Sequence, residues 1–191
     1  MWASLGVPRL NTPEVITFVR EFGLFILLIV ATFTDIAYGK VYNWLVYPGI
    51  GAGVALSAAG QYCGAGPPGV AESLVGLALA GGLFGFFFFR GWMGAADVKL
   101  AAAIGALKGW QFFVWALIYI TLAGFILAVA VLVWRGRFIE SLKNSIVFFF
   151  RPKKLKKKME AADEKPVMIP YGLAMAVGTM CAWFLERAFA G

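Results

Sequence analysis

Histidine is absent from this chain of 191 residues, and cysteine occurs only twice, at Cys63 and Cys181. Histidine is the commonest general base and a common metal ligand, so its absence excludes Ser-His and Cys-His catalytic pairs. A structural zinc site needs about four Cys or His ligands, more than this chain has. We therefore expect no metal site and no cofactor, and we interpret both cysteines as small apolar packing residues.

Charge is also scarce. Charged residues make up 14% of the chain, against about 25% in an ordinary soluble domain, while 61% of the residues are hydrophobic. This balance predicts an integral membrane protein, and the length predicts one membrane-embedded domain over residues 1–191. Residues 1–14 lack a basic stretch that leads directly into an apolar core, so we expect no cleavable signal peptide.

Long apolar runs predict the helices. A membrane-spanning helix needs about 20 mostly apolar residues, and five runs meet this length. A sixth run, residues 98–108, is shorter and rich in small residues. The sequence therefore predicts an all-α polytopic protein with about six transmembrane helices in one bundle. The predicted helices cover residues 15–35, 44–63, 70–90, 98–108, 111–134 and 167–187.

The basic residues predict the orientation, because cytoplasmic loops collect Lys and Arg. If the loop after the first helix is cytoplasmic, that side holds 13 of the 17 basic residues. The N-terminus is then outside, and residues 135–166 form a large basic cytoplasmic loop between the fifth and sixth helices. Within it, apolar residues recur at near-helical spacing over 138–150, which predicts an amphipathic helix in the membrane interface.

The net charge of +7 resides mostly in this loop. The run RPKKLKKK, residues 151–158, is typical of segments that lie against anionic lipid headgroups. We therefore expect lipid contact here and no binding of nucleic acid.

Two carboxylates stand out because both lie at the predicted cytoplasmic edge of apolar runs, where charge is costly. Asp35 closes the first run, although the negative end of a helix dipole disfavours an acid there. Asp97 follows a glycine-rich turn and is suited to cap a helix over 98–108. The other acids have simpler interpretations; Glu21, for example, is expected to pair with the adjacent Arg20 near the outer face.

Convergence of Asp35 and Asp97 would create an aspartyl protease pair. Two neighbouring carboxylates cannot both ionise cheaply, so they share one proton. The ionised group can then activate a water molecule while the protonated group binds the scissile carbonyl. Such a pair predicts a bell-shaped dependence of activity on pH.

The order of three motifs carries a family resemblance. Asp35 ends the first helix, GAADVKL spans residues 94–100, and Ile169-Pro170-Tyr171-Gly172 opens the last helix. The chain resembles the type IV prepilin peptidases, which are intramembrane GxGD aspartyl proteases. This resemblance implies that Asp35 and Asp97 are the catalytic pair. The residues that match supporting motif positions are Asn43, Gly94, Lys99, Pro170, Tyr171 and Gly172.

Two motif positions differ from the family pattern, with Ala96 in place of glycine and Tyr42 in place of proline. Larger family members also carry a four-cysteine zinc insertion linked to N-methylation, and nothing comparable lies between Asp35 and Asp97. The chain is therefore similar to the short, peptidase-only form of Flp (tight-adherence) pili, without N-methyltransferase activity. The implied substrates are prepilins or pseudopilins, cleaved after a glycine at the cytoplasmic face of the bacterial inner membrane.

Three alternatives remain from the sequence. A small proton-coupled transporter could use both carboxylates as a relay, but such proteins often show internal repeats, and none is evident here. A catalytically inactive subunit of a pilus or secretion machine is compatible with Ala96. A presenilin-like protease would close with Pro-Ala-Leu where this chain has Pro-Tyr-Gly.

Overall fold

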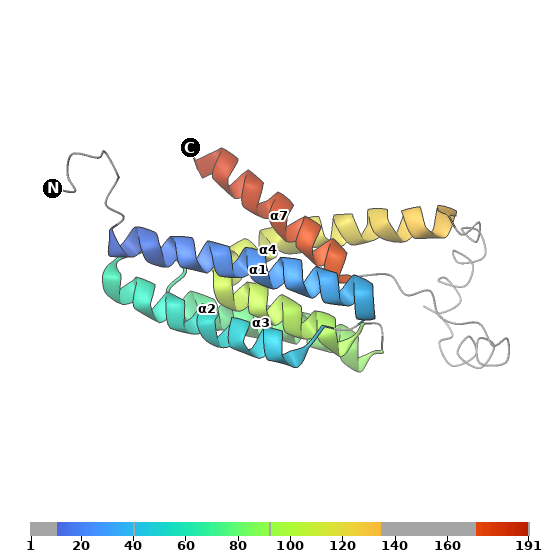
Figure 1. Cartoon of the computed structure of the whole chain (residues 1–191), viewed down its shortest axis with the longest axis horizontal. Coiled ribbons are helices and arrows are strands. Elements are labelled where there is room, and N and C mark those ends of the chain that lie inside the picture. Colours follow the sequence, from blue (N-terminus) through green and yellow to red (C-terminus); the bar gives the residue numbers. More distant parts are fainter. Residues whose placement is uncertain (1–10, 40, 92, 135–170, 191) are drawn as a thin grey trace.

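The computed structural model describes residues 11–39, 41–91, 93–134 and 171–190, and every regular element among them is helical. The basic loop 135–166 and Pro170 lie outside the described residues, so the expectations about them remain predictions. The helices are α1 (Thr12–Tyr38), α2 (Asn43–Cys63), α3 (Val70–Phe89), α4 (Ala95–Trp134) and α7 (Tyr171–Ala190) (Figure 1).

The predicted segments 98–108 and 111–134 both belong to α4, which is interrupted at Gly109. Gly109 has φ 79° and ψ 173°, a backbone conformation that residues other than glycine rarely adopt. The chain folds back at this residue, and the second half of α4 runs antiparallel to the first (Figure 1). One glycine therefore supplies the reversal that the sequence predicted between two separate helices.

The first half of α4 is the centre of the bundle. Leu100, Ile104 and Leu107 are almost completely buried, and small residues let the neighbouring helices approach its backbone. The backbones of Gly76 in α3 and Gly105 in α4 are in direct contact. A Cβ atom on Gly53 of α2 would lie only 2.9 Å from the carbonyl carbon of Ala106. The small residues of this segment are therefore explained by close helix packing on several sides.

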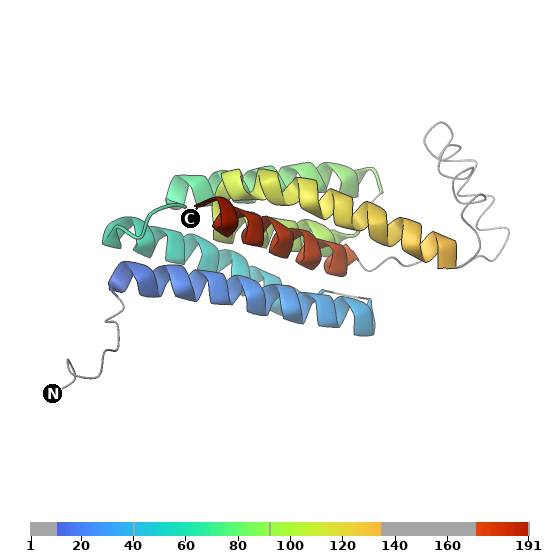
Figure 2. The same ribbon diagram turned by 90° about the horizontal axis from the view of Figure 1, so that it is seen from above.

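Helix α7 lies between α1 and the second half of α4 (Figure 2). Gly178 of α7 packs directly against the backbone of Ile120 in α4, so these two helices cross in close contact. Gly124 and Ala174 continue this contact toward the first turn of α7.

Among the residues that the structure describes, three helical segments are long and apolar enough to cross a membrane: Thr12–Tyr38, Val70–Phe89 and the part Ala95–Val131 of α4, which contains the reversal. Large apolar side chains cover their outer surfaces, among them Phe18, Phe33 and Phe125, which are each about two-thirds exposed. Such surfaces are stable against lipid rather than water. The chain is therefore a membrane protein built from helices.

The expected pairing of Glu21 with Arg20 is wrong. Glu21 instead accepts a hydrogen bond from Lys108 of α4, with 2.8 Å between Oε1 and Nζ. Arg20 is buried and donates to the carbonyl oxygen of Pro67 at 2.9 Å. Adjacent residues on a helix point about 100° apart, so each of these side chains meets a different neighbour.

Candidate functional site

Asp35 lies in the last turn of α1 and contacts the first turn of α7. Its Oδ2 accepts a hydrogen bond from the backbone N–H of Gly172 at 2.8 Å. Thr32, one helical turn earlier, donates its hydroxyl to the carbonyl oxygen of Gly172 at 3.3 Å. Both peptide groups of one glycine are therefore held by the end of α1.

This contact also explains why an acid is stable at the end of α1. Gly172 is the second residue of α7, where backbone N–H groups have no partner within their own helix. The positive end of the α7 dipole faces the carboxylate of Asp35. An unfavourable interaction with one helix end is thus offset by a favourable interaction with another.

The absence of a side chain at Gly172 permits this approach. A Cβ atom at this position would lie 2.8 Å from Oδ2 of Asp35 and 3.0 Å from its Cβ. Both separations are well below ordinary van der Waals contact, so a larger residue requires the carboxylate to move. The position of Asp35 therefore requires a residue without a side chain at position 172.

Asp97 does not cap a helix that begins at residue 98, because α4 already begins at Ala95. The aspartate lies within the first turn, where its carboxylate is close to the backbone of Gly94. Negative charge is favourable at this end of a helix. The residue is 8% exposed, whereas Asp35 is partly exposed.

The two aspartates lie close enough for their charges to interact. The side chain of Tyr171, the first residue of α7, interacts with the charge of Asp97 in the same way. The first two residues of α7 thus lie beside both acids, with Gly172 bonded to Asp35 and Tyr171 near Asp97. Three segments that are distant in sequence meet here.

A second polar contact joins the segments that follow the acids. Lys99 donates a hydrogen bond from Nζ to Oδ1 of Asn43 at 2.7 Å, and its ammonium group lies 5.5 Å from the ring centroid of Tyr47. Lys99 is two residues after Asp97, and Asn43 is the first residue of α2. The contact therefore joins the start of α2 to the first turns of α4.

The sequence pattern of the type IV leader peptidase family matches residues 22–133, more than half of the chain. The chain belongs to the type IV leader peptidase family. Neither a comparison with curated proteins nor one with solved structures gave a match.

Membership of the leader peptidase family indicates a protease of the membrane. The matched segment includes Asp35, Asn43, Asp97 and Lys99 but ends before α7. The tertiary structure adds Gly172 to these residues through its hydrogen bond to Asp35.

Two contact residues were not found by sequence reasoning. Thr32 is one turn before Asp35 on the same helix, and a search for polar neighbours at helical spacing would have found it. Tyr47 lies beside Lys99 only because α2 and α4 pack together, so no local pattern identifies it.

Within the described part of the chain, no group of three or more His, Cys, Asp or Glu residues is arranged to hold a metal ion.

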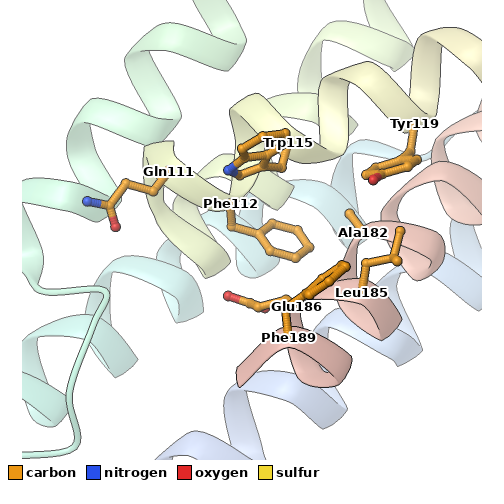
Figure 3. Close-up of a pocket in the computed structure, with 8 residues that line it drawn as sticks. All are labelled: Gln111, Phe112, Trp115, Tyr119, Ala182, Leu185, Glu186 and Phe189. Carbon is orange, nitrogen blue, oxygen red and sulfur yellow. The ribbon is translucent and has the colours of Figure 1, made fainter. Parts of the chain in front are cut away.

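The aspartates do not lie in the apolar cavity of about 500 Å³ between the second half of α4 and α7 (Figure 3). Phe112, Trp115 and Phe189 contribute to its lining, with Glu186 at its edge. The lining residues of α7 are in its C-terminal half, whereas Asp35 contacts its first turn. The cavity is therefore not part of the candidate active site, although its volume is large.

Proposed function

We propose that this protein is an intramembrane aspartyl endopeptidase that removes the short basic leader of type IV prepilin-like or pseudopilin-like substrates. The supporting observation is the hydrogen bond between Gly172 and Asp35, which brings α7 to the two interacting carboxylates. Family membership supports the general reaction, since leader peptidases hydrolyse peptide bonds. The proposed site lies at the cytoplasmic face of the bacterial inner membrane.

The proposed mechanism uses Asp35 and Asp97 as a pair with one shared proton. The ionised carboxylate takes a proton from water, and the resulting hydroxide attacks the scissile carbonyl carbon. The protonated carboxyl donates a hydrogen bond to the carbonyl oxygen. Collapse of the tetrahedral intermediate breaks the C–N bond, and a carboxyl proton passes to the leaving amine. One water molecule is consumed for each bond cleaved.

The expected substrate has an apolar membrane helix whose start must unwind to expose one peptide bond. A glycine before that bond is suitable, because glycine lowers helix stability by about 1 kcal/mol relative to alanine. We propose that the reaction stops at hydrolysis, without N-methylation, because the sequence between Asp35 and Asp97 has no four-cysteine insertion.

Co-expression with a candidate prepilin tests this function, with leader removal followed as a shift in gel mobility. We expect the wild-type chain to shorten a prepilin that carries a basic leader and a glycine before the scissile bond. A prepilin with that glycine replaced by leucine is the matched control and should remain uncut. Correct membrane insertion without cleavage of any prepilin would favour an inactive assembly subunit.

Removal of the polar link between α2 and α4 should slow cleavage. Lys99→Met and Asn43→Ala each delete one side of a 2.7 Å hydrogen bond, and we expect each to lower the rate of leader removal roughly fivefold, as for loss of about 1 kcal/mol. The double variant should be no slower than either single variant, because both remove the same contact. Additive losses in the rates of purified variants would show that the two residues act separately.

A further inference from the structure

A partly buried ion cluster joins three helices at the end of the bundle opposite the aspartates, with the side chain of Glu186 49% exposed. Nζ of Lys108 lies 2.8 Å from Oε1 of Glu21 in α1 and 2.9 Å from Oε2 of Glu186 in α7. The side chains of Lys108 and Glu21 are only 8% and 11% exposed. The indole of Trp183, also in α7, donates to the other carboxylate oxygen of Glu21 at 2.6 Å.

The same three helices form the candidate active site at their other ends. Asp35 follows Glu21 on α1, Asp97 precedes Lys108 on α4, and Gly172 precedes Glu186 on α7. The first and third pairs are 14 residues apart, and the second is 11 residues apart. Both separations are close to a whole number of helical turns, so the members of each pair share a face of their helix.

The ion cluster and the candidate active site are close enough along each helix for the helix to couple them rigidly. At 1.5 Å per residue, the pairs are separated by about 21 Å on α1 and α7 and about 16 Å on α4. None of the three stretches contains the break at Gly109, which directly follows Lys108. A change in the tilt of α7 at Glu186 would therefore move Gly172 relative to Asp35.

The packing around the C-terminal end of α7 indicates that the ion cluster holds this end of the helix in place. No side chain of the described residues fills the cavity beside Phe112 and Glu186 (Figure 3), so these residues pack incompletely against this end of α7. The ammonium group of Lys108 also lies 4.6 Å from the ring centroid of Phe112, at the wall of the same cavity. Separation of Lys108 from Glu21 is costly because both side chains are buried, whereas Glu186 is 49% exposed and the charge of Arg20 also interacts with both glutamates.

We propose that Lys108, Glu21 and Glu186 are positioning residues for the aspartate pair. They hold α1, α4 and α7 in register from the far end, so that Gly172 stays bonded to Asp35 near Asp97. This inference rests on the proposed peptidase function, and it adds residues outside the family motifs that act through helix geometry rather than by contact with substrate.

Two variants separate positioning from simple stability. Lys108→Met removes the cation bonded to Glu21 and leaves only Arg20 to interact with that buried carboxylate, so it should lower both the folded fraction and kcat. The double variant Lys108→Met/Glu21→Gln also removes the carboxylate that has lost its bonded cation and should recover thermal stability. Its kcat for leader removal should nevertheless stay about tenfold below wild type with KM unchanged, since misplacement by about 1 Å can cost about 100-fold.

The pH profile of kcat provides a readout that stability does not affect. If the two aspartates are held less closely together, their charges interact more weakly and the two apparent pKa values of the pair differ less. The two limbs of the bell-shaped profile should therefore lie closer together in the double variant than in wild type. Ser73→Ala is the matched control, because it removes a buried 2.6 Å hydrogen bond between α3 and Ala106 without touching the cluster. It should lower stability while leaving kcat and the pH profile of the folded protein unchanged.

A measurement that needs no activity completes the test. Spin labels at Ile36→Cys and Val177→Cys, two exposed positions on α1 and α7, are introduced after Cys63 and Cys181 are replaced by serine. We expect the distance distribution to broaden in the Lys108→Met/Glu21→Gln background. An unchanged distribution together with wild-type kcat would overturn the positioning role, whereas a broadened distribution without cleavage by the wild-type chain would count against the peptidase function alone.

Discussion

Asp35→Asn and Asp97→Asn should each reduce leader removal by about 10³-fold or more, because proposed catalysis requires one ionised and one protonated carboxyl group. Asparagine keeps the size of the side chain but neither accepts a proton from water nor donates one to the leaving amine at neutral pH. The hydrogen bond from Gly172 to Oδ2 of Asp35 can still be made by an amide oxygen. The loss should therefore appear in kcat rather than in folding.

Initial rates with purified variants and a synthetic prepilin measure this effect, with thermal unfolding as the test of structure. Glu14→Gln is a suitable control, because Glu14 lies on the same helix as Asp35 but at its opposite end, where it accepts a hydrogen bond from the backbone of Asn11. It should process prepilin at the wild-type rate. Normal processing by either aspartate variant would exclude the proposed pair.

Gly172→Ala should lower kcat by about 100-fold while the protein remains folded. The added methyl group would lie 2.8 Å from Oδ2 of Asp35 and 3.0 Å from its Cβ, so the carboxylate has to move away from the N–H group that now binds it. Displacements of this kind at a catalytic group, of the order of 1 Å, cost about 100-fold in rate. Alanine is itself a good helix residue, so helix propensity gives no reason for a loss.

Gly124→Ala is the matched control for this substitution. Gly124 lies on α4 near the same end of α7, but a Cβ atom there would meet Ala174 at an ordinary 3.8 Å. We expect this variant to retain the wild-type rate of leader removal and the wild-type unfolding temperature. Full activity of Gly172→Ala would show that the approach of α7 to Asp35 is not needed for cleavage.

Local properties of the sequence determined the class of protein and the candidate acids. Apolar runs of membrane length predicted α1, α2 and α3 with small changes at their ends, and the glycine at 109 was part of a predicted break. The order of three motifs, at Asp35, around Asp97 and at residues 169–172, indicated the family that the matched segment confirms. These features can be predicted because hydropathy, chain length and motif spacing are properties of the linear sequence and do not depend on how the helices pack.

Only the tertiary structure decided which residues meet. Asp35 and Gly172 are 137 positions apart, and Lys99 and Asn43 are 56 apart, so no local pattern specifies either contact. Likewise, Glu21 pairs with Lys108 rather than with adjacent Arg20, because helix geometry directs successive side chains to different neighbours. The small residues of the first half of α4 predicted a short segment, and packing by α2 and α3 made it the core. Such contacts depend on how whole helices pack, which the periodicity of a single helix does not determine.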